Sequence, residues 1–273
     1  MLSVETRHAI DPATARGFDT EALRRNFHVG GIFADGEIKL IYTHYDRMIV
    51  GGAVPAGKDL VLDEVPQCGT DTILARREMV VVNIGGEGIV RAGSDYAMAK
   101  GDMLYLGMGS GPVTFSGGGR FYILSAPAHK TLPSRLIRID EAARIDLGSQ
   151  ATSNERTIHQ FVHPEVMESC QLVVGMTKLH NGSVWNTMPA HVHDRRMEAY
   201  LYVDLPEDQM AVHLMGEPTE TRHMIVRNEE GAISPPWSIH SGAGTASYAF
   251  IWAMAGDNVN YKDVEMVGMG DMR

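Results

Sequence analysis

The sequence predicts an all-β protein that contains two similar β-barrel domains. Its apolar runs are short, rich in Val, Ile, Leu and Tyr, and separated by Gly, Asp, Asn or Pro, and 29 glycines are spread along the 273 residues. Short strands divided by turn residues at this spacing are typical of β-sandwiches and barrels. The second half also repeats the order of segments in the first, and such an echo indicates internal duplication.

The expected strands follow from these apolar runs. In the first half they cover Lys39–Tyr42, Met48–Val50, Met79–Ile84, Met103–Leu106, Val113–Phe115 and Phe121–Leu124. In the second half they cover Gln171–Leu179, Glu198–Val203, Gln209–Met215, His223–Val226 and Tyr248–Met254. Helical periodicity is weak, and only Pro12–Phe27 and Pro164–Ser169 are expected to form short helices.

The two halves share three landmarks. Each half opens a β-rich block with an arginine pair, continues through a glycine-led turn and ends with an aromatic strand. In the first half these segments are Arg76-Arg77-Glu78, Gly101-Asp102 and Phe121–Ala126. In the second half they are Arg195-Arg196-Met197-Glu198, Gly231-Ala232 and Tyr248–Ala253. The polar stretch Pro133–Asn154 is expected to link the halves. We therefore predict an N-terminal domain at residues 1–142 and a C-terminal domain at residues 143–273.

Composition narrows the classes of partner. The net charge of −10 argues against nucleic acid and anionic membranes, because both need a basic surface. It leaves an anionic small molecule open, since a few local cations outweigh a distant average field. Two cysteines do not suggest a disulfide framework. Without a secretory signal or an apolar run of ~18 residues, we expect a cytoplasmic protein.

One segment contains a plausible set of metal ligands. His191 and His193 are two residues apart, so in a strand both imidazoles point to one face. Glu198 has the opposite parity, so a loop or bulge between Asp194 and Met197 is needed to bring it to the same point. His240 follows 42 residues later, after a stiff Pro-Pro turn. A lone His-x-His pair is more often not a metal site, but three imidazoles with one carboxylate suit zinc, iron, manganese or nickel.

These ligands resemble the cupin metal signature, His-x-His-x4-Glu with a later His. The usual glycines of that signature are absent, since Trp185, Leu205 and Trp237 stand at their places. Longer segments are more specific, and through them the chain resembles the 5-keto-4-deoxyuronate isomerase family nearly end to end. These segments are Asn186–Glu198, Ser234–Gly242, Glu220–His223, Asp46–Gly52, Arg76–Glu78 and Val82–Gly86.

The resemblance implies two cupin-like (jelly-roll) domains, a hexamer and one zinc ion held by His191, His193, Glu198 and His240. It implies a ketol-isomerase that converts 5-dehydro-4-deoxy-D-glucuronate to 3-deoxy-D-glycero-2,5-hexodiulosonate, a step in pectin degradation and uronate catabolism. The first domain departs from the metal pattern: with Glu78 aligned to Glu198, Asp71, Ile73 and Pro112 stand where the histidines would fall. We therefore expect the N-terminal domain to be metal-free.

The expected reaction moves a carbonyl from C1 to C2 through an enediolate, whose charge a divalent cation would stabilise. The base that removes the C2 proton is open between a metal-bound hydroxide and a carboxylate; the candidate carboxylates are Glu198, if it can leave the metal, and Asp194. The substrate carboxylate needs a cation, and guanidinium groups bind carboxylates in bidentate fashion. The candidates are Arg195, Arg196, Arg222 and Arg156, although a salt bridge is the commoner role for any one of them. Aromatic walls for the pocket are sought at Trp185, Tyr202 and Trp252, for which core packing is the commoner role.

Three other functions stay open. The 5-deoxy-glucuronate isomerase of inositol catabolism performs similar chemistry on a similar acid. A metal-dependent cupin dioxygenase uses the same ligand types around a redox-active metal. A storage or sugar-binding bicupin would bind ligand without turnover.

Overall fold

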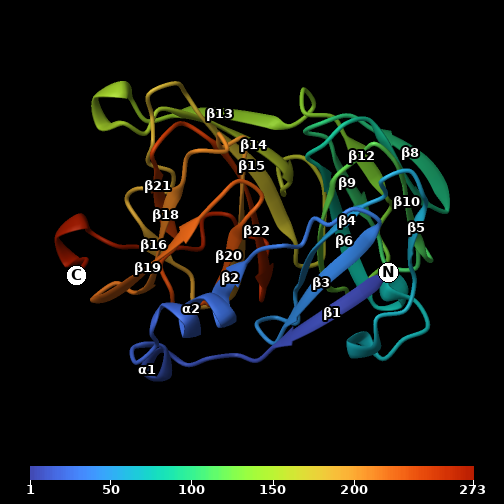
Figure 1. The fold of residues 1–273 in the computed structure, drawn as a ribbon, viewed down its shortest axis with the longest axis horizontal. Helices are drawn as coiled ribbons and strands as arrows, with labels where there is room; N and C mark the ends of the chain where they lie inside the picture. Colours follow the sequence, from blue (N-terminus) through green and yellow to red (C-terminus); the bar gives the residue numbers. More distant parts are fainter. The chain divides into compact units, whose positions relative to one another are not determined.

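The computed structural model describes residues 1–273, and most of its regular structure is β-strand (Figure 1). The chain divides into two compact units. Unit 1 comprises Met1–Arg7, Gly31–Ala142 and Phe161–Val173, and unit 2 comprises His8–Gly30, Ala143–Gln160 and Val174–Arg273. The all-β prediction is confirmed. The division between the units includes the predicted boundary at 142/143, but segments 8–30 and 161–173 belong to the unit of the other half.

Unit 1 contains one large and one small sheet. The seven strands of the large sheet lie in the order β1 (Leu2–Arg7), β3 (Glu37–Thr43), β4 (Ile49–Val54), β11 (Phe121–Pro127), β6 (Arg77–Asn83), β9 (Met103–Leu106) and β12 (Arg135–Ile137). The small sheet has the order β5 (Leu60–Leu62), β10 (Val113–Gly117), β7 (Gly88–Ala92) and β8 (Ser94–Met98). Two 3-10 turns, η1 (Pro66–Cys68) and η2 (Ile73–Ala75), precede β6.

Unit 2 repeats this plan. Its large sheet has the order β13 (Ala143–Leu147), β14 (Arg156–Val162), β15 (Val173–Leu179), β22 (Ala249–Gly256), β17 (Arg196–Val203), β20 (Gly231–Ser234) and β2 (His28–Val29). A three-stranded sheet has the order β19 (Glu220–Val226), β18 (Ala211–Glu217) and β21 (Ser241–Gly244), and β16 (His191–Val192) pairs with β23 (Glu265–Met266). The helices are α1 (Pro12–Ala15) and α2 (Thr20–Phe27), with 3-10 turns η3 (Gln150–Thr152) and η4 (Met269–Asp271).

The strand orders support internal duplication. The series β3-β4-β11-β6-β9 in unit 1 has the same sequence order and neighbours as β14-β15-β22-β17-β20 in unit 2. Each predicted strand lies within or overlaps an observed one. The shortest strands and the polar edge strands were not predicted, because they carry too little apolar pattern.

The core of unit 1 corrects one alignment. Met79 and Val81 of β6 belong to the apolar core between the sheets, together with Leu104, Leu106 and Phe121. Because side chains alternate along a strand, Glu78 points to the opposite face of the sheet. Glu198 lines the inner pocket of unit 2, so Met79, and not Glu78, occupies its counterpart in unit 1. The alignment of Glu78 with Glu198 is therefore wrong by one residue.

One local prediction is confirmed and two need correction. The short helices expected within Pro12–Phe27 are present as α1 and α2, and Asp19 caps the second with a hydrogen bond from the Ala22 amide. Pro164–Ser169 is not a helix, because the chain makes only a turn in which the Val166 and Met167 amides donate to the carbonyl of His163. The expected polar link Pro133–Asn154 contains the division between the units, but it also forms strands β12 and β13, which lie at edges of the two large sheets.

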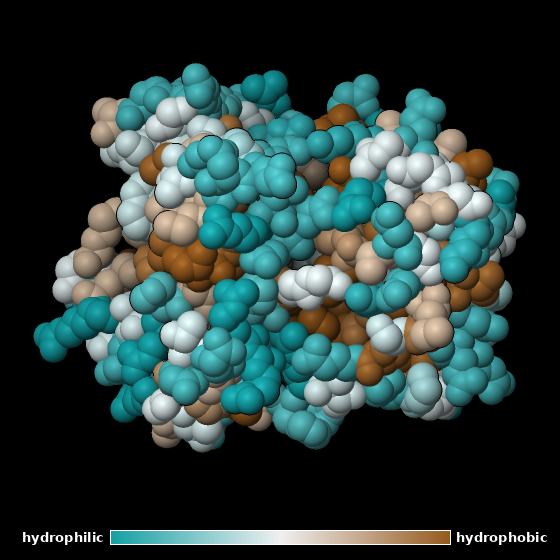
Figure 2. Space-filling view, viewed as in Figure 1, coloured by the Kyte–Doolittle hydropathy of each residue, from teal (hydrophilic) through white to brown (hydrophobic).

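Hydrophilic side chains cover most of the face seen in Figure 2, with apolar areas confined to small patches. The two cysteines are free thiols. No helix combines the length and apolar character that crossing a membrane requires.

Candidate metal centre

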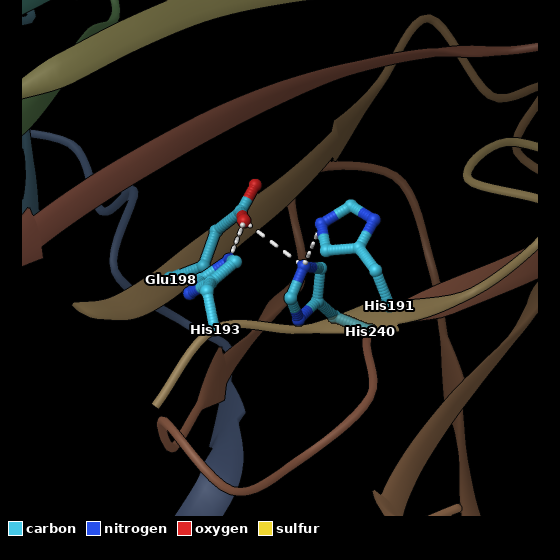
Figure 3. Close-up of side chains that lie close together, drawn as sticks. All are labelled: His191, His193, Glu198 and His240. Atoms are coloured by element: carbon cyan, nitrogen blue, oxygen red, sulfur yellow. Dashed lines mark hydrogen bonds and ion pairs between the residues drawn. The ribbon is translucent and has the colours of Figure 1, made fainter. Parts of the chain in front are cut away.

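Four side chains converge in unit 2. His191, His193, Glu198 and His240 each offer one ligand atom, and these atoms all lie within 4.8 Å of one another (Figure 3). His193, Glu198 and His240 are almost fully buried, whereas His191 is partly exposed. No other group of three or more His, Cys, Asp or Glu residues in the chain has this geometry.

The local fold explains how residues of opposite parity meet. His191 lies in the short strand β16, and its Cα pairs with that of Met266 in β23. The chain then turns, with the Arg196 amide donating to the His193 carbonyl at 3.0 Å, and β17 begins at Arg196. This is the loop that the spacing predicted between Asp194 and Met197. His240 follows a second turn, closed by the Ser238 amide on the Pro235 carbonyl.

The hydrogen bonds of the cluster fit a cation at its centre. Nδ1 of His193 is 2.7 Å from the carbonyl oxygen of Arg196, which can only accept, so this nitrogen carries the proton. The Nε2 of a neutral His193 then has a bare lone pair, yet it faces Glu198 Oε2, also an acceptor, at 2.9 Å. Lone pairs that face one another are unfavourable unless a proton or a metal ion lies between them.

The same conflict recurs at His240. Its Nε2 lies 3.0 Å from Glu198 Oε2 and 3.0 Å from His191 Nε2. One ring nitrogen has at most one proton, which does not serve both neighbours. Three imidazoles and one carboxylate thus present their lone pairs to one point, as ligands of a divalent cation do.

Charge and burial favour the ligand forms of these groups. Burial, together with neighbouring His240, lowers the pKa of His191 to about 3, so the imidazole is neutral at physiological pH. For Glu198, burial raises the pKa, but the adjacent His240 and His193 more than offset this and hold the pKa well below its usual range. A neutral imidazole and an ionised carboxylate are the forms that bind metal.

The cluster opens into a pocket of about 220 Å³. Its lining is mostly apolar, with a few polar groups, a composition usual for small-molecule sites. The lining residues are Leu147, Arg156, Ile158, Thr177, Thr187, Met188, Pro189, His191, Glu198, Tyr200, Phe250, Trp252, Met254, Tyr261, Val264 and Met266. A volume of this size suits a small metabolite.

Some of the residues predicted to act as the base or to form aromatic walls line the pocket, and others do not. Glu198 and Trp252 line the pocket, whereas Asp194 is exposed in the turn before β17 and does not line it. Tyr202 is buried and hydrogen-bonded to Nδ1 of His213 at 2.8 Å. Trp185 forms an isolated antiparallel β-bridge with Ala243 and does not line the pocket.

The four candidate arginines have different surroundings. Arg195 forms salt bridges with Asp263 and Glu265. Arg196 is fully buried and donates to the Asp263 carbonyl. Arg222 pairs with Glu220 and donates to the Arg16 carbonyl. Arg156 alone among them lines the pocket.

Sequence reasoning missed four polar residues of the pocket, Thr177, Thr187, Tyr200 and Tyr261. Tyr200 lies two residues after Glu198 in β17, and the alternation of side chains in a strand would have placed it on the same face. Its hydroxyl lies 2.7 Å from that of Thr187. Burial, reinforced by the nearby Glu198 charge, raises the pKa of Tyr200 well above its usual value, so it is a neutral phenol. Thr187 and Tyr261 come from irregular segments far apart in the chain, so no strand periodicity places them in the pocket.

Comparison with known proteins identifies the family. The model of the KduI/IolB family matches residues 30–267. The chain belongs to the KduI/IolB family. It is 66% identical, over the whole length of both chains, to a protein of Cereibacter sphaeroides named 4-deoxy-L-threo-5-hexosulose-uronate ketol-isomerase. Proteins of the same name from Agrobacterium fabrum and Shouchella clausii are 59% and 49% identical, and each match covers at least 99% of both chains.

Solved structures support the fold of this family member. An IolB-like protein of Salmonella typhimurium matches with a TM-score of 0.65 at 17% identity, covering 81% of this chain and 86% of that one. An oxalate decarboxylase of Bacillus subtilis, described with Mn(II) centres, matches with a TM-score of 0.55 at 10% identity, covering 80% and 71%. At these identities the likeness concerns the fold alone, and it confirms the prediction of cupin-type domains.

Proposed function

We propose that this protein is a 4-deoxy-L-threo-5-hexosulose-uronate ketol-isomerase, an intramolecular oxidoreductase that interconverts an aldose and a ketose. The observation that supports this most is full-length identity of 49–66% to relatives of that name, together with a four-ligand cluster that opens into a small pocket. The proposed product is 3-deoxy-D-glycero-2,5-hexodiulosonate.

We assign the metal ligands to His191, His193, Glu198 and His240, and the metal to zinc. Three imidazoles and one carboxylate are usual zinc ligands, and the facing lone pairs described above support a bound cation. A divalent ion at this point would supply Lewis-acid stabilisation of the negative charge that develops on O1 and O2. The N-terminal cupin-like domain is proposed to be metal-free, since the apolar Met79 occupies the counterpart of Glu198.

The residues of the pocket have roles that follow from their chemistry. The apolar wall excludes water from the reacting end of the substrate. The hydroxyls of Tyr200 and Thr187 can donate hydrogen bonds to substrate oxygens, and the high pKa of Tyr200 keeps its proton in place. Of the two candidate carboxylates for the base, only Glu198 lines the pocket, and it would have to leave the metal to take the proton.

The wider setting rests on family resemblance. We propose that the protein is a cytoplasmic homohexamer that acts on a small anionic sugar acid in pectin and uronate catabolism, without a nucleic-acid or membrane partner. The 5-deoxy-glucuronate isomerase reaction is the second candidate, because the matching family model joins the KduI and IolB branches. The identities of 49–66% favour the first branch.

The test is isomerisation of 4-deoxy-L-threo-5-hexosulose uronate by metal-analysed protein. We expect turnover that disappears on chelation and returns with zinc. Turnover of 5-deoxy-glucuronate alone would transfer the assignment to the inositol branch. Oxygen uptake with a small organic substrate, lost on replacement of iron by zinc, would indicate a dioxygenase. Sugar-acid binding without any turnover by the fully metallated protein would indicate a binding protein.

A further inference from the structure

The pocket contains one arginine that lacks a carboxylate partner. Arg156 is half-buried at the start of β14, and its one side-chain hydrogen bond runs from Nη1 to the Asn154 carbonyl at 2.8 Å. It forms no salt bridge, whereas Arg195 and Arg222, the other candidates with carboxylates in reach, are paired. Glu198 is the only carboxylate that lines the same pocket, and it belongs to the ligand cluster.

A half-buried cation without a counter-ion is unfavourable unless a ligand compensates it. Burial lowers the pKa of Arg156, and the groups that act in the opposite direction are the phenols of Tyr200 and Tyr261, not acids. Guanidinium retains its proton even so. The pocket therefore offers a fixed positive charge, with several donors still unused, to whatever enters.

Arg156 and Glu198 reach the pocket from different parts of the large sheet of unit 2. Strands β15 and β22 lie between β14 and β17, so the two residues stand on strands that are not neighbours. They also stand at different levels along the strands, because Glu198 pairs with Met254 near the end of β22, whereas the residue before Arg156 accepts a hydrogen bond from the His180 amide just past the end of β15. Both side chains line the same pocket. A ligand with an acid at one end and a carbonyl at the other can therefore place its two ends at the two sites.

The wall between these two sites is apolar and aromatic. Trp252 lies on β22, between β14 and β17. Its ring packs against that of Tyr261 with centroids 5.4 Å apart, and its Nε1 donates to the Thr177 hydroxyl. Because this wall is uncharged, the charged groups of the pocket are Arg156 on one side and the metal-ligand cluster on the other. A few polar groups of this kind orient a ligand in a mostly apolar site.

We infer that Arg156 binds the carboxylate of the substrate, so that the acid end lies over β14 and the carbonyl end lies at the His191, His193, Glu198 and His240 cluster. This inference deepens the proposed function and rests on it for the identity of the substrate. It also states a ligand class independent of the reaction: six-carbon acids bind, and their neutral counterparts bind poorly.

The test compares Arg156→Gln and Arg156→Lys with the wild type and with a matched control, Arg144→Gln. Arg144 is an exposed arginine on the adjacent strand β13 and pairs with Asp146 outside the pocket. Metal content and circular dichroism check that each variant is folded and loaded. The first measurement is the KM and kcat for 4-deoxy-L-threo-5-hexosulose uronate. The second is calorimetric binding of D-galacturonate and of D-galactose, its neutral counterpart, up to millimolar concentration.

A charge-assisted hydrogen-bonded pair contributes enough that Arg156→Gln should raise KM roughly 10- to 100-fold. The effect on kcat should be smaller, metal content should be unchanged, and Arg156→Lys should recover part of the loss. Wild type and Arg144→Gln should bind D-galacturonate in preference to D-galactose, and Arg156→Gln should lose that preference.

Two results would overturn the inference: a KM for Arg156→Gln within threefold of wild type, or a wild-type protein that shows no preference for the acid over the neutral sugar. The binding measurement separates this inference from the proposed function. A wild type that prefers the acid, loses the preference in Arg156→Gln and yet turns over no keto-uronate would retain the clamp and refute the isomerase assignment.

Discussion

Replacing Glu78 by glutamine should lower the denaturant concentration at which the protein unfolds, although no catalytic role is assigned to this residue. Glu78 is fully buried in unit 1. Its Oε1 accepts hydrogen bonds from the Gln171 and Leu172 amides, and its Oε2 accepts from the Cys170 amide and the Tyr105 hydroxyl, all at 2.7 Å. One carboxylate thus fixes the segment 170–172 to strand β6.

The magnitude follows from counting donors. A glutamine keeps one oxygen for two of the amides, and the Tyr105 hydroxyl can rotate to accept from the new NH2 group. The third amide is left without an acceptor, at a cost of about 1–3 kcal/mol, and the remaining bonds lose their charge assistance, at about 1 kcal/mol each. We expect Glu78→Gln to lower the free energy of unfolding by about 4 kcal/mol, a large share of the ~5–15 kcal/mol available to a domain.

Urea unfolding followed by far-ultraviolet circular dichroism measures this difference. Tyr105→Phe removes one donor and leaves three amides on an intact carboxylate, so its loss should be about 1–2 kcal/mol. Glu64→Gln is the exposed control in the same unit, with an expected change below about 0.5 kcal/mol. A Glu78→Gln protein within 1 kcal/mol of wild type would refute the argument that these four bonds act together.

Three further predictions concern unit 2. His240→Ala should remove most of the bound metal and leave the circular dichroism spectrum unchanged, since the unit has its own core. The control is His223→Ala, at an exposed position. Loss of the β-sheet signal in His240→Ala would show instead that the fold depends on the metal. Burial lowers the pKa of His213 to about 3. The imidazole therefore stays neutral in the folded protein, whereas in the unfolded chain it takes up a proton near pH 6.5. The free energy of unfolding should fall as the pH drops from about 6.5 toward 3, by about 1.4 kcal/mol per pH unit for this group. Urea unfolding at several pH values should show a shallower slope for His213→Gln, and equal slopes would contradict the assignment. Arg195→Ala should change KM less than threefold in steady-state assays, because Asp263 and Glu265 already hold its guanidinium outside the pocket; a KM rise as large as that expected for Arg156→Gln would assign the clamp to Arg195.

The sequence predicted those features that repeat at short range. Strands such as β9 and β11 have clear apolar runs, and the four candidate ligands were recognisable because His191, His193 and Glu198 lie within eight residues. The parity of Glu198 even predicted the turn before β17. Features that follow from residue spacing along one strand could therefore be predicted from the sequence.

Features that depend on contacts between distant segments could not be predicted from the sequence. Nothing in the sequence separates Arg156 from Arg195, because the difference is whether an acid from the 263–265 segment lies beside the guanidinium. Tyr261 reaches the pocket from a stretch without regular structure. The alignment of Glu78 with Glu198 is wrong by a single residue, because it matches residue types and not the face of the strand on which each side chain lies.

The exchange of segments between the units has a consequence for how the chain can be made or divided. His28 of β2 pairs with Ala232 of β20, 204 positions later (232 − 28), so this sheet edge closes only after most of the chain has been synthesised. Residues 161–173, which Glu78 anchors in unit 1, likewise emerge after the rest of that unit. A cut at 142/143 would therefore not release two independent proteins: one fragment would lack the acceptor strand for residues 28–29, and the other would expose β20 as an unpaired edge prone to aggregation. The repeated halves have become interdependent, and any expression vector or fusion for this protein should keep them on one continuous polypeptide.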